Sequence, residues 1–318
     1  MEYSNAVVFP GQGSQKPGMA QDFYNEFDGS RLAFEEAADA LGMDIAAICF
    51  AEEDPRLNLT EFTQPAIVTA EIAMYRYLVT EYGFNPEFFA GHSLGEYSAL
   101  VAADVIPFTN AVQIVHKRGA LMQEAVPKGV GSMAAIIYPD IENTDLAGIT
   151  TRAGAEVANM NSKEQTVISG EKEAVKKAAD DFRDYIVKTY GEEAGGSLAI
   201  HFLEVSAPFH TTLMRPIEKE FQEYLNQFSG NFKNENASKV LSNFTGKFHS
   251  KENLIENLVS QISGSVRWIE NMRLLIEKSN EIYEVGPGKP LARFFRMEGK
   301  DVKSILNLRS CKKTFTKE

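Results

Sequence analysis

A serine flanked by glycines constrains the fold of this 318-residue chain more than any other feature. The stretch AGHSLGEYSAL, residues 90–100, carries Ser93 in a Gly-x-Ser-x-Gly pattern. Apolar residues 88–90 precede it as a short strand, and apolar positions recur at helical spacing after it. At such a strand-to-helix turn, a tight bend exposes the serine hydroxyl above the sheet. The pattern therefore predicts that Ser93 is a nucleophile at the end of a buried strand.

Short apolar runs alternate with amphipathic stretches along the chain, which predicts an α/β protein rather than a helical bundle or a β-sandwich. We expect strands at 6–9, 88–90, 240–241 and 282–285, and helices at 31–41, within 63–82 after Pro65, and at 213–228, 252–262 and 269–278.

The middle of the chain has a different pattern. Strand-like runs at 132–137, 156–160 and 165–170 are followed by a helix over 175–186 and a fourth strand over 198–205. This order suits a small inserted α+β subdomain over residues 129–203, and we expect this subdomain to be ferredoxin-like. Residues 1–128 and 204–318 are then expected to form a large α/β-hydrolase-like domain with a parallel sheet.

The formal net charge of -12 argues against a nucleic-acid partner, because phosphate binding depends on clustered Lys and Arg. Residues 289–318 differ from the rest, with nine basic and three acidic side chains. This asymmetry is typical either of a landing site for an acidic partner or of a solvated tail.

Several features of the sequence predict a cytoplasmic protein without a membrane partner. No apolar stretch approaches the ~20 residues of a membrane helix. Residues 1–9 also lack a basic segment followed by an apolar one. The chain has only two cysteines, Cys49 and Cys311, which fits a reducing compartment.

A nucleophilic serine needs a base, and His210 is the best candidate among five histidines. It follows Pro208 and Phe209 at the end of a predicted strand and precedes a helix, where active-site side chains are often presented. The other four lie in less suitable positions: His92 beside the nucleophile, His116 in mid-helix, His201 in an apolar strand and His249 in a polar loop.

Two further residues have a chemical rationale of their own. The helix that follows Ser93 offers unpaired N–H groups to a developing oxyanion, so the Leu94 N–H is a candidate donor. Arg118 lies in the apolar segment VQIVHKRGALM, where a guanidinium is costly to bury unless it meets an anion. Either a ligand carboxylate or a structural salt bridge could supply that anion.

Neither a dinucleotide nor a metal ion is expected to bind. GQGSQKPG, residues 11–18, has its third glycine two positions beyond the dinucleotide-binding spacing, and Pro17 would disturb the start of the helix. No cluster of Cys, His and carboxylate residues has metal-ligand spacing.

Six segments together resemble the malonyl-CoA:acyl carrier protein acyltransferases, in order over residues 7–295. They are FPGQGSQ (9–15), TQPAI (63–67), GHSLGE (91–96), RGALMQEAVP (118–127), VSAPFH (205–210) and EVGPGK (284–289). The resemblance covers both the fatty-acid enzymes and the free-standing enzymes that serve polyketide synthases, so the pathway stays open.

The resemblance implies a role for each matching residue. It implies that Ser93 is the nucleophile, that His210 is the base and that the Gln261 backbone carbonyl orients His210. The backbone N–H groups of Gln12 and Leu94 are then the oxyanion donors, and Arg118 is the partner of the substrate carboxylate. Gln64 and Asn161 are implied as residues of the pocket. Phe209 stands before the histidine, as in relatives that use malonyl rather than methylmalonyl units.

The implied reaction is a ping-pong transfer of malonyl from malonyl-CoA, through a Ser93 ester, to a holo acyl carrier protein. No bound cofactor is implied, and we expect a monomer.

Two alternatives remain at this point. One is a hydrolase that clears acyl groups from carrier proteins, although such relatives tend to lack the arginine. The other is a non-catalytic docking subunit, whose basic residues Lys289, Arg293 and Arg296 would meet an acidic carrier.

Overall fold

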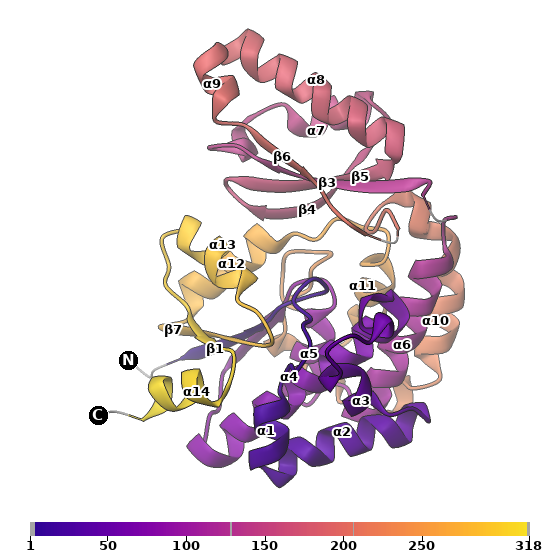
Figure 1. The fold of residues 1–318 in the computed structure, drawn as a ribbon, viewed down its shortest axis with the longest axis vertical. Helices are drawn as coiled ribbons and strands as arrows, with labels where there is room; N and C mark the ends of the chain where they lie inside the picture. Colours follow the sequence, from indigo (N-terminus) through magenta and orange to yellow (C-terminus); the bar gives the residue numbers. More distant parts are fainter. Residues whose placement is uncertain (1–3, 128, 206, 317–318) are drawn as a thin grey trace.

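The computed structural model describes residues 4–127, 129–205 and 207–316, and it has two units stacked along the long axis of the molecule (Figure 1). The larger unit contains a parallel sheet and the smaller one an antiparallel sheet. The predicted fold class is therefore confirmed. Residues 1–3, 128, 206 and 317–318, which belong to the predicted large domain, lie outside the described residues.

The larger sheet has four described strands in the order β2-β1-β7-β8, all of them parallel. The strands are β1 Asn5–Phe9, β2 Phe88–Gly91, β7 Glu281–Val285 and β8 Lys303–Ile305. The central strand β1 reads NAVVF and is buried on both faces, as expected for a parallel sheet covered by helices. Because parallel strands end at one edge, the loops after β1, β2 and β7 meet there.

Helices cover this sheet on both faces (Figure 1). The α-helices are α1 Gln21–Glu26, α2 Asp28–Leu41, α3 Ile45–Phe50, α4 Thr60–Tyr82, α5 Gly95–Ala102, α6 Phe108–Glu124, α10 Glu218–Asn226, α11 Leu254–Ser260, α12 Trp268–Lys278, α13 Pro290–Met297 and α14 Leu308–Phe315. The short 3-10 helices are η1 Pro55–Asn58, η3 Thr212–Ile217, η4 Ser229–Asn231 and η5 Asn234–Lys239. Among the described residues, no helix combines the length and the apolar character needed to cross a membrane.

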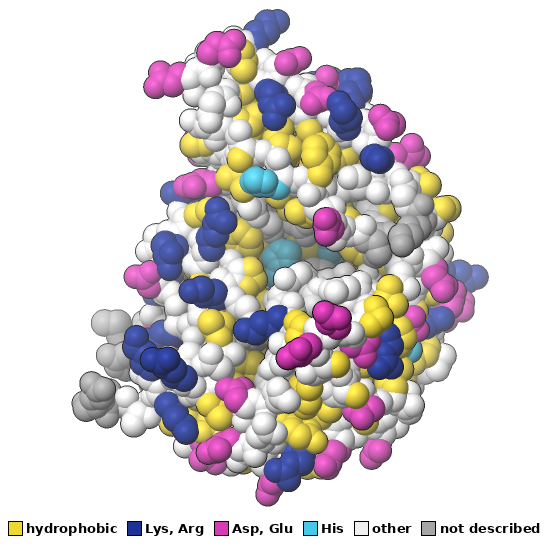
Figure 2. All heavy atoms as spheres, viewed as in Figure 1, with side chains coloured by type: hydrophobic (Ala, Val, Ile, Leu, Met, Phe, Trp, Pro, Cys, Tyr) yellow, Lys and Arg dark blue, Asp and Glu magenta, His cyan; other side chains and the backbone are white. Residues whose placement is uncertain are grey.

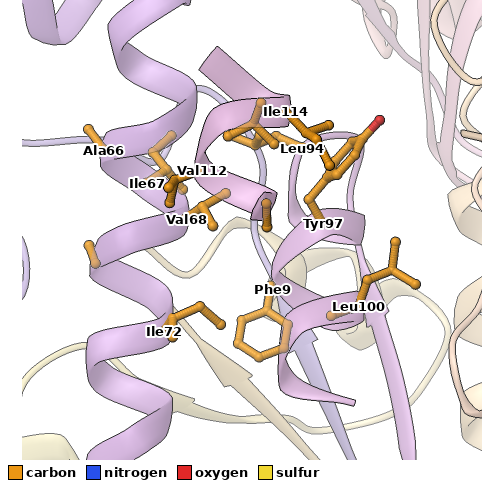
Figure 3. Close-up of a cluster of buried hydrophobic side chains, with 14 of the residues drawn as sticks. Phe9, Ala66, Ile67, Val68, Ile72, Leu94, Tyr97, Leu100, Val112 and Ile114 are labelled. Atoms are coloured by element: carbon orange, nitrogen blue, oxygen red, sulfur yellow. The ribbon is translucent and has the colours of Figure 1, made fainter. Parts of the chain in front are cut away.

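The main core lies where α4, α5 and α6 pack against β1, and it holds the helices that carry the site. Figure 3 shows Phe9 of β1 facing Ile72 of α4 and Leu100 of α5, with Val112 and Ile114 of α6 in the same cluster. All three are at most 2% exposed. Burial of each such side chain contributes roughly 1.5 to 3 kcal/mol, so the core fixes the relative positions of these helices.

The smaller unit has the chain order and sheet order of a ferredoxin-like fold. Its strands pair in the order β4-β5-β3-β6, and its elements are β3 Gly131–Ile137, η2 Ile141–Asn143, α7 Leu146–Arg152, β4 Glu156–Ser162, β5 Gln165–Glu171, α8 Lys172–Tyr190, α9 Glu192–Gly196 and β6 Ala199–Phe202. Ala134, Ile136 and Ile168 form a separate core with α7 and α8 on one face of this sheet. This separate core supports the bounds 129–203, which remain our proposal.

Strand β4 connects the two units. Asn159 pairs with Val266 of the larger unit in an isolated bridge, in which the Met160 N–H donates to Val266 O at 2.9 Å and the Val266 N–H donates to Ala158 O at 2.8 Å. The end of β4 is thereby fixed over the carboxyl edge of the larger sheet.

Several predicted element boundaries are wrong for reasons that concern proline or sheet pairing. Helix α4 begins at Thr60 rather than after Pro65, because one proline near a helix start removes only one hydrogen bond. The helix predicted at 213–228 is divided, because Pro216 cannot donate a backbone bond and lies in the 3-10 segment before α10. The helix predicted at 252–262 is shorter, Leu254–Ser260.

Two predicted strands also differ from the structure, one in length and one in pairing. The strand predicted at 198–205 ends at Phe202, because the chain then leaves β3 and crosses to the larger unit. His210 therefore lies in a loop and not at the end of a strand. The run at 240–241 makes only single bridges, Val240 to Phe89 and Leu241 to Phe248.

Candidate active site

The nucleophile turn between β2 and α5 holds Ser93 in a strained conformation. Ser93 has a φ of 50°, in the left-handed region that side chains other than glycine rarely adopt. An added Cβ on Gly91 would lie 1.9 Å from the Gly95 carbonyl carbon, and one on Gly95 would lie 2.1 Å from Phe9 O. Both glycines are thus required by close backbone approach, and the turn presents the serine side chain at the carboxyl edge of the sheet.

His210 approaches the serine from the loop between β6 and η3. Its Nε2 lies 2.8 Å from Ser93 Oγ, and its Nδ1 lies 2.9 Å from the Gln261 main-chain oxygen. A carbonyl oxygen can only accept, so Nδ1 carries the proton and Nε2 is free to accept one from the serine. The structure brings together Ser93, His210 and Gln261 in the geometry that a serine and its general base require.

The His210 imidazole is only 4% exposed. Burial, and then the positive charge of Arg118, lower the pKa of His210 to about 3. The neutral form, which a general base needs, is therefore present throughout the physiological pH range.

Arg118 of α6 lies beside the serine and is 1% exposed. Among the described residues, its side-chain hydrogen-bond partners are Gln64 Oε1 at 2.9 Å, Gln261 Oε1 at 2.9 Å and Ser93 Oγ at 3.4 Å. None of these three is a carboxylate. Burial lowers the pKa of Arg118, and its guanidinium also faces the Tyr97 ring at 5.5 Å. The site therefore holds a desolvated cation whose described partners carry no negative charge.

Two backbone N–H groups near Ser93 have no acceptor in the described part of the chain, those of Gln12 and Leu94. The Phe9 carbonyl accepts from the His92 N–H at 3.0 Å, so the loop that carries Gln12 lies against the nucleophile turn. The Ser93 N–H, in contrast, is already bound to Asn243 Oδ1 at 2.6 Å. The first two groups are available to an oxyanion, whereas the third is not.

The remaining candidates lie around this centre. The Gln64 side chain is buried and engaged with Arg118. Asn161 of β4 accepts a hydrogen bond from His92 Nε2 through its Oδ1 at 2.8 Å, and this bond joins the small unit to the nucleophile turn. Phe209 is buried beside His210 and belongs to the main core. The structure thus places all nine predicted site residues around one centre, and their roles remain predictions.

Sequence reasoning missed the polar residues behind the nucleophile. Asn243 clamps the turn, accepting from the Ser93 N–H and donating from Nδ2 to Gly91 O at 2.7 Å. Glu96 on α5 is fully buried and faces His249 Nε2 at 2.8 Å. His249 lies in a loop, as predicted, but it is only 2% exposed, and its Nδ1 is bonded to Asn257. A carboxylate in the apolar helix after Ser93 was the one signal that could have indicated this network.

The site opens into a hollow between the two units. Figure 2 shows this hollow with histidine atoms at its floor. Among residues 4–127, 129–205 and 207–316, no group of three His, Cys, Asp or Glu side chains could hold a metal ion.

Comparisons with known proteins agree with this geometry. Residues 6–201 match the family described as the acyl transferase domain. The chain is 39% identical over 303 residues to a malonyl CoA-acyl carrier protein transacylase of Staphylococcus aureus (strain MRSA252), covering 94% of this chain and 93% of the relative. The crystal structure of the transacylase of that name from Clostridium perfringens has a TM-score of 0.87 and 34% identity, covering 98% of this chain and 96% of the other. A malonyl-transacylase in complex with its type II PKS acyl-carrier protein has a TM-score of 0.88 and 35% identity, covering 98% and 99%.

Proposed function

This chain belongs to the acyl transferase family, and from that premise we propose that it transfers malonyl from malonyl-CoA to an acyl carrier protein through an ester on Ser93. Its transacylase relatives, similar over nearly their whole length, support an acyltransferase activity. The observation that carries the choice of malonyl is Arg118, a buried guanidinium beside Ser93 Oγ with no carboxylate among its described hydrogen-bond partners. The free carboxylate of a malonyl group would supply the missing negative charge.

In the first step, Ser93 Oγ attacks the thioester carbonyl carbon while His210 Nε2 accepts the serine proton. The oxyanion binds the N–H groups of Gln12 and Leu94, and the Gln261 carbonyl stabilises the imidazolium through Nδ1–H. The carbon–sulfur bond then breaks, and the coenzyme A thiolate takes the proton from His210. The product of this step is malonyl-Ser93.

In the second step, the phosphopantetheine thiol of the carrier gives its proton to His210, and its sulfur attacks the ester carbonyl. The carbon–oxygen bond to Ser93 breaks, and Oγ recovers the proton from His210. A hydrolase would use water in place of this thiol. Family membership and the presence of Arg118 favour the transferase.

The carrier-binding surface that we propose includes Lys289, Arg293 and Arg296. All three side chains are exposed. Lys289 directly precedes α13, and Arg293 and Arg296 lie on the exposed face of this helix, because Leu291 and Phe295 on its other face are buried in the core. Figure 2 shows Lys and Arg side chains gathered beside the hollow, on the side where Figure 1 places α13. An acidic carrier would be steered to this side by its charge.

Three further proposals concern the state of the enzyme. We propose that it works without a bound cofactor, because the residues described can carry out every proton and acyl transfer. We propose a monomer, because one chain supplies the whole site. We propose that the protein is located in the cytoplasm, because Cys49 and Cys311 are free and buried thiols, as expected in a reducing compartment.

The Ser93→Ala variant tests this function. Its malonyl transfer should fall by at least about 10⁴-fold, because removal of the nucleophile eliminates the ester route. Carrier binding should remain, measured by titration of the holo carrier protein. Retention of malonyl transfer by Ser93→Ala would contradict the proposal, and it would favour a role as a docking subunit.

A further inference from the structure

One buried residue, Gln261, contacts all three of the main functional residues. The Gln261 main-chain oxygen accepts from His210 Nδ1, and its side-chain Oε1 accepts from Arg118 Nη2, each at 2.9 Å. Its Nε2 donates to the Ser93 main-chain oxygen at 3.1 Å. Gln261 is completely buried, directly after α11. Its position therefore affects the base, the nucleophile turn and the guanidinium together.

A buried carboxylate holds this side chain from behind. Glu96 Oε2 accepts from Gln261 Nε2 at 2.7 Å and from the Asn243 N–H at 2.9 Å. Glu96 Oε1 faces His249 Nε2 at 2.8 Å, and the other ring nitrogen, Nδ1, faces Asn257 Nδ2 at 3.1 Å. Because an amide NH₂ can only donate, Nδ1 accepts from Asn257 and Nε2 donates to Glu96. Glu96 thus has three donors and no contact with solvent.

We propose that Glu96 is a positioning residue for malonyl transfer, which acts on Arg118 through the side-chain amide of Gln261. This inference rests on the proposed function. A carboxylate only accepts hydrogen bonds, so it fixes the Gln261 NH₂ toward itself and the Gln261 oxygen toward the guanidinium. In the reversed orientation, the amide NH₂ would face the N–H groups of Arg118, donor against donor. Glu96 therefore determines which end of the amide the carboxylate-binding arginine meets.

The negative charge of Glu96 also has an electrostatic effect across the amide. Arg118 is buried with neutral partners, and Glu96 is the charge on the far side of the amide that bonds it. A fixed anion on the other side of one amide group stabilises the positive charge and the orientation of the guanidinium before the substrate arrives. The main-chain oxygen of the same residue orients His210, so the group that binds the substrate carboxylate and the base both contact Gln261, one through its side chain and the other through its backbone.

The Glu96→Gln variant removes the charge and keeps the shape. The new NH₂ group is accommodated when His249 adopts its other tautomer and the Asn257 amide turns so that its oxygen accepts from Nδ1, so the variant should fold. We expect the rate of Ser93 acylation by malonyl-CoA to fall about tenfold, because a charge-assisted hydrogen bond is roughly twice as strong as a neutral one. Acylation by acetyl-CoA, which has no carboxylate for Arg118, should fall less. The preference for malonyl over acetyl should therefore decrease.

Glu71→Gln is the matched control. Glu71 of α4 is also a fully buried carboxyl group. It accepts a hydrogen bond at 2.5 Å from Ser98, which lies on α5, the helix that carries Glu96. Burial raises the pKa of Glu71 well above its ordinary value, and its hydrogen-bond partner is Ser98 rather than Gln261, Arg118 or His210. Both acylation rates should stay at the level of the unchanged protein. Unfolding midpoints of all variants show whether each is folded.

A double-mutant cycle tests whether Glu96 acts through Gln261. Gln261→Met keeps the main-chain oxygen and removes the side-chain bonds, and it should lower the malonyl preference at least as far as Glu96→Gln. If the route is Gln261, adding Glu96→Gln to Gln261→Met should lower the preference no further. Should Glu96→Gln not fold, Glu96→Asp replaces it with the same expectation, because the shorter side chain draws the carboxylate away from Gln261.

The inference is overturned by additive effects, by an unchanged malonyl preference in folded Glu96→Gln, or by an unchanged preference in Gln261→Met. The unchanged protein is measured in the same series. If it forms no malonyl-Ser93 ester, the proposed function itself fails. If it forms the ester and the cycle is additive, only the role of Glu96 is wrong.

Discussion

Arg118 and His210 face the same oxygen atom. Ser93 Oγ lies 2.8 Å from His210 Nε2 and 3.4 Å from Arg118 Nη2. When His210 accepts the serine proton, an imidazolium forms near a guanidinium in a buried site, and this is electrostatically unfavourable. A substrate carboxylate bound to Arg118 would offset that repulsion. The arginine can thus affect the basicity of His210 as well as the binding of the substrate.

The first prediction concerns the pH dependence of Ser93 acylation. The pKa of His210 is lowered to about 3, so the base is neutral well below pH 6.5. Acylation by malonyl-CoA should therefore change little between pH 8 and about pH 5, measured in single turnovers by quench and mass spectrometry. In an Arg118→Met variant, the pKa of His210 should rise, and the acidic fall in rate should begin at a higher pH. A fall centred near pH 6.5 in the unchanged protein would contradict this account.

The same pKa shift affects stability, with a sign that can be stated. The folded chain resists protonation of His210, whereas the unfolded chain takes up the proton near pH 6.5. The contribution of His210 to the free energy of unfolding is therefore fully present above pH 6.5 and is lost as the pH falls toward about 3.

The second prediction concerns substrate choice. Replacement of Arg118 by Ala should reduce the malonyl preference over acetyl by about two orders of magnitude or more, since a bidentate pair contributes two charge-assisted hydrogen bonds. Arg118→Lys keeps the charge but lacks the planar guanidinium, so its malonyl preference should lie between those of the unchanged protein and Arg118→Ala. Acylation rates with the two thioesters measure this preference. Equal preferences in all three proteins would make Arg118 a structural residue.

The nucleophile turn could be predicted from sequence because all its determinants are local. The glycines on either side of Ser93, the preceding strand and the following helix occupy consecutive positions, and the structure has them as expected. The class of the small unit was also accessible, because the strand and helix patterns of residues 129–203 follow one another without a break. The position of His210 before a predicted helix and the apolar surroundings of Arg118 indicate these two residues from sequence, whereas the role of the Gln261 carbonyl is implied by the family resemblance alone.

The network behind the serine could not be predicted, because its members meet only in three dimensions. Asn243 is 150 residues from the Ser93 N–H that it binds, and His249 is 153 residues from Glu96. His249 lies among polar residues, so its sequence neighbourhood indicates solvent, yet tertiary packing buries it. Pro216 and the early exit of β6 from its sheet altered boundaries for similar reasons, since both depend on what the rest of the fold allows.

The third prediction concerns the glycine after Leu94. In Gly95→Ala, the new Cβ would lie 2.1 Å from Phe9 O and 2.8 Å from Pro10 O, both of them backbone atoms. We expect a loss of about 3 kcal/mol or more in the free energy of unfolding, because α5 must move away from β1. Urea unfolding measures this loss. Gly196→Ala is the control, since a Cβ there meets nothing within 4 Å, and the two variants should not be equally stable.

The fourth prediction concerns the carrier. Reversal of charge at Lys289, Arg293 and Arg296 should raise the KM for the carrier at low salt and leave the acylation of Ser93 by malonyl-CoA unchanged. The effect should diminish as salt is added, because the steering is electrostatic. The reversal of Lys176 and Lys177, which lie on α8 of the small unit, serves as the control. An unchanged carrier KM at low salt would remove α13 from the docking surface.

The most direct measurement is intact-protein mass spectrometry after the protein is mixed first with malonyl-CoA and then with holo acyl carrier protein. We predict a malonyl adduct on the Ser93 peptide that persists in buffer and moves to the carrier, with far less adduct from acetyl-CoA. An adduct that forms equally well from acetyl-CoA and is lost to water without reaching the carrier would contradict malonyl transfer, and it would make this chain a hydrolase.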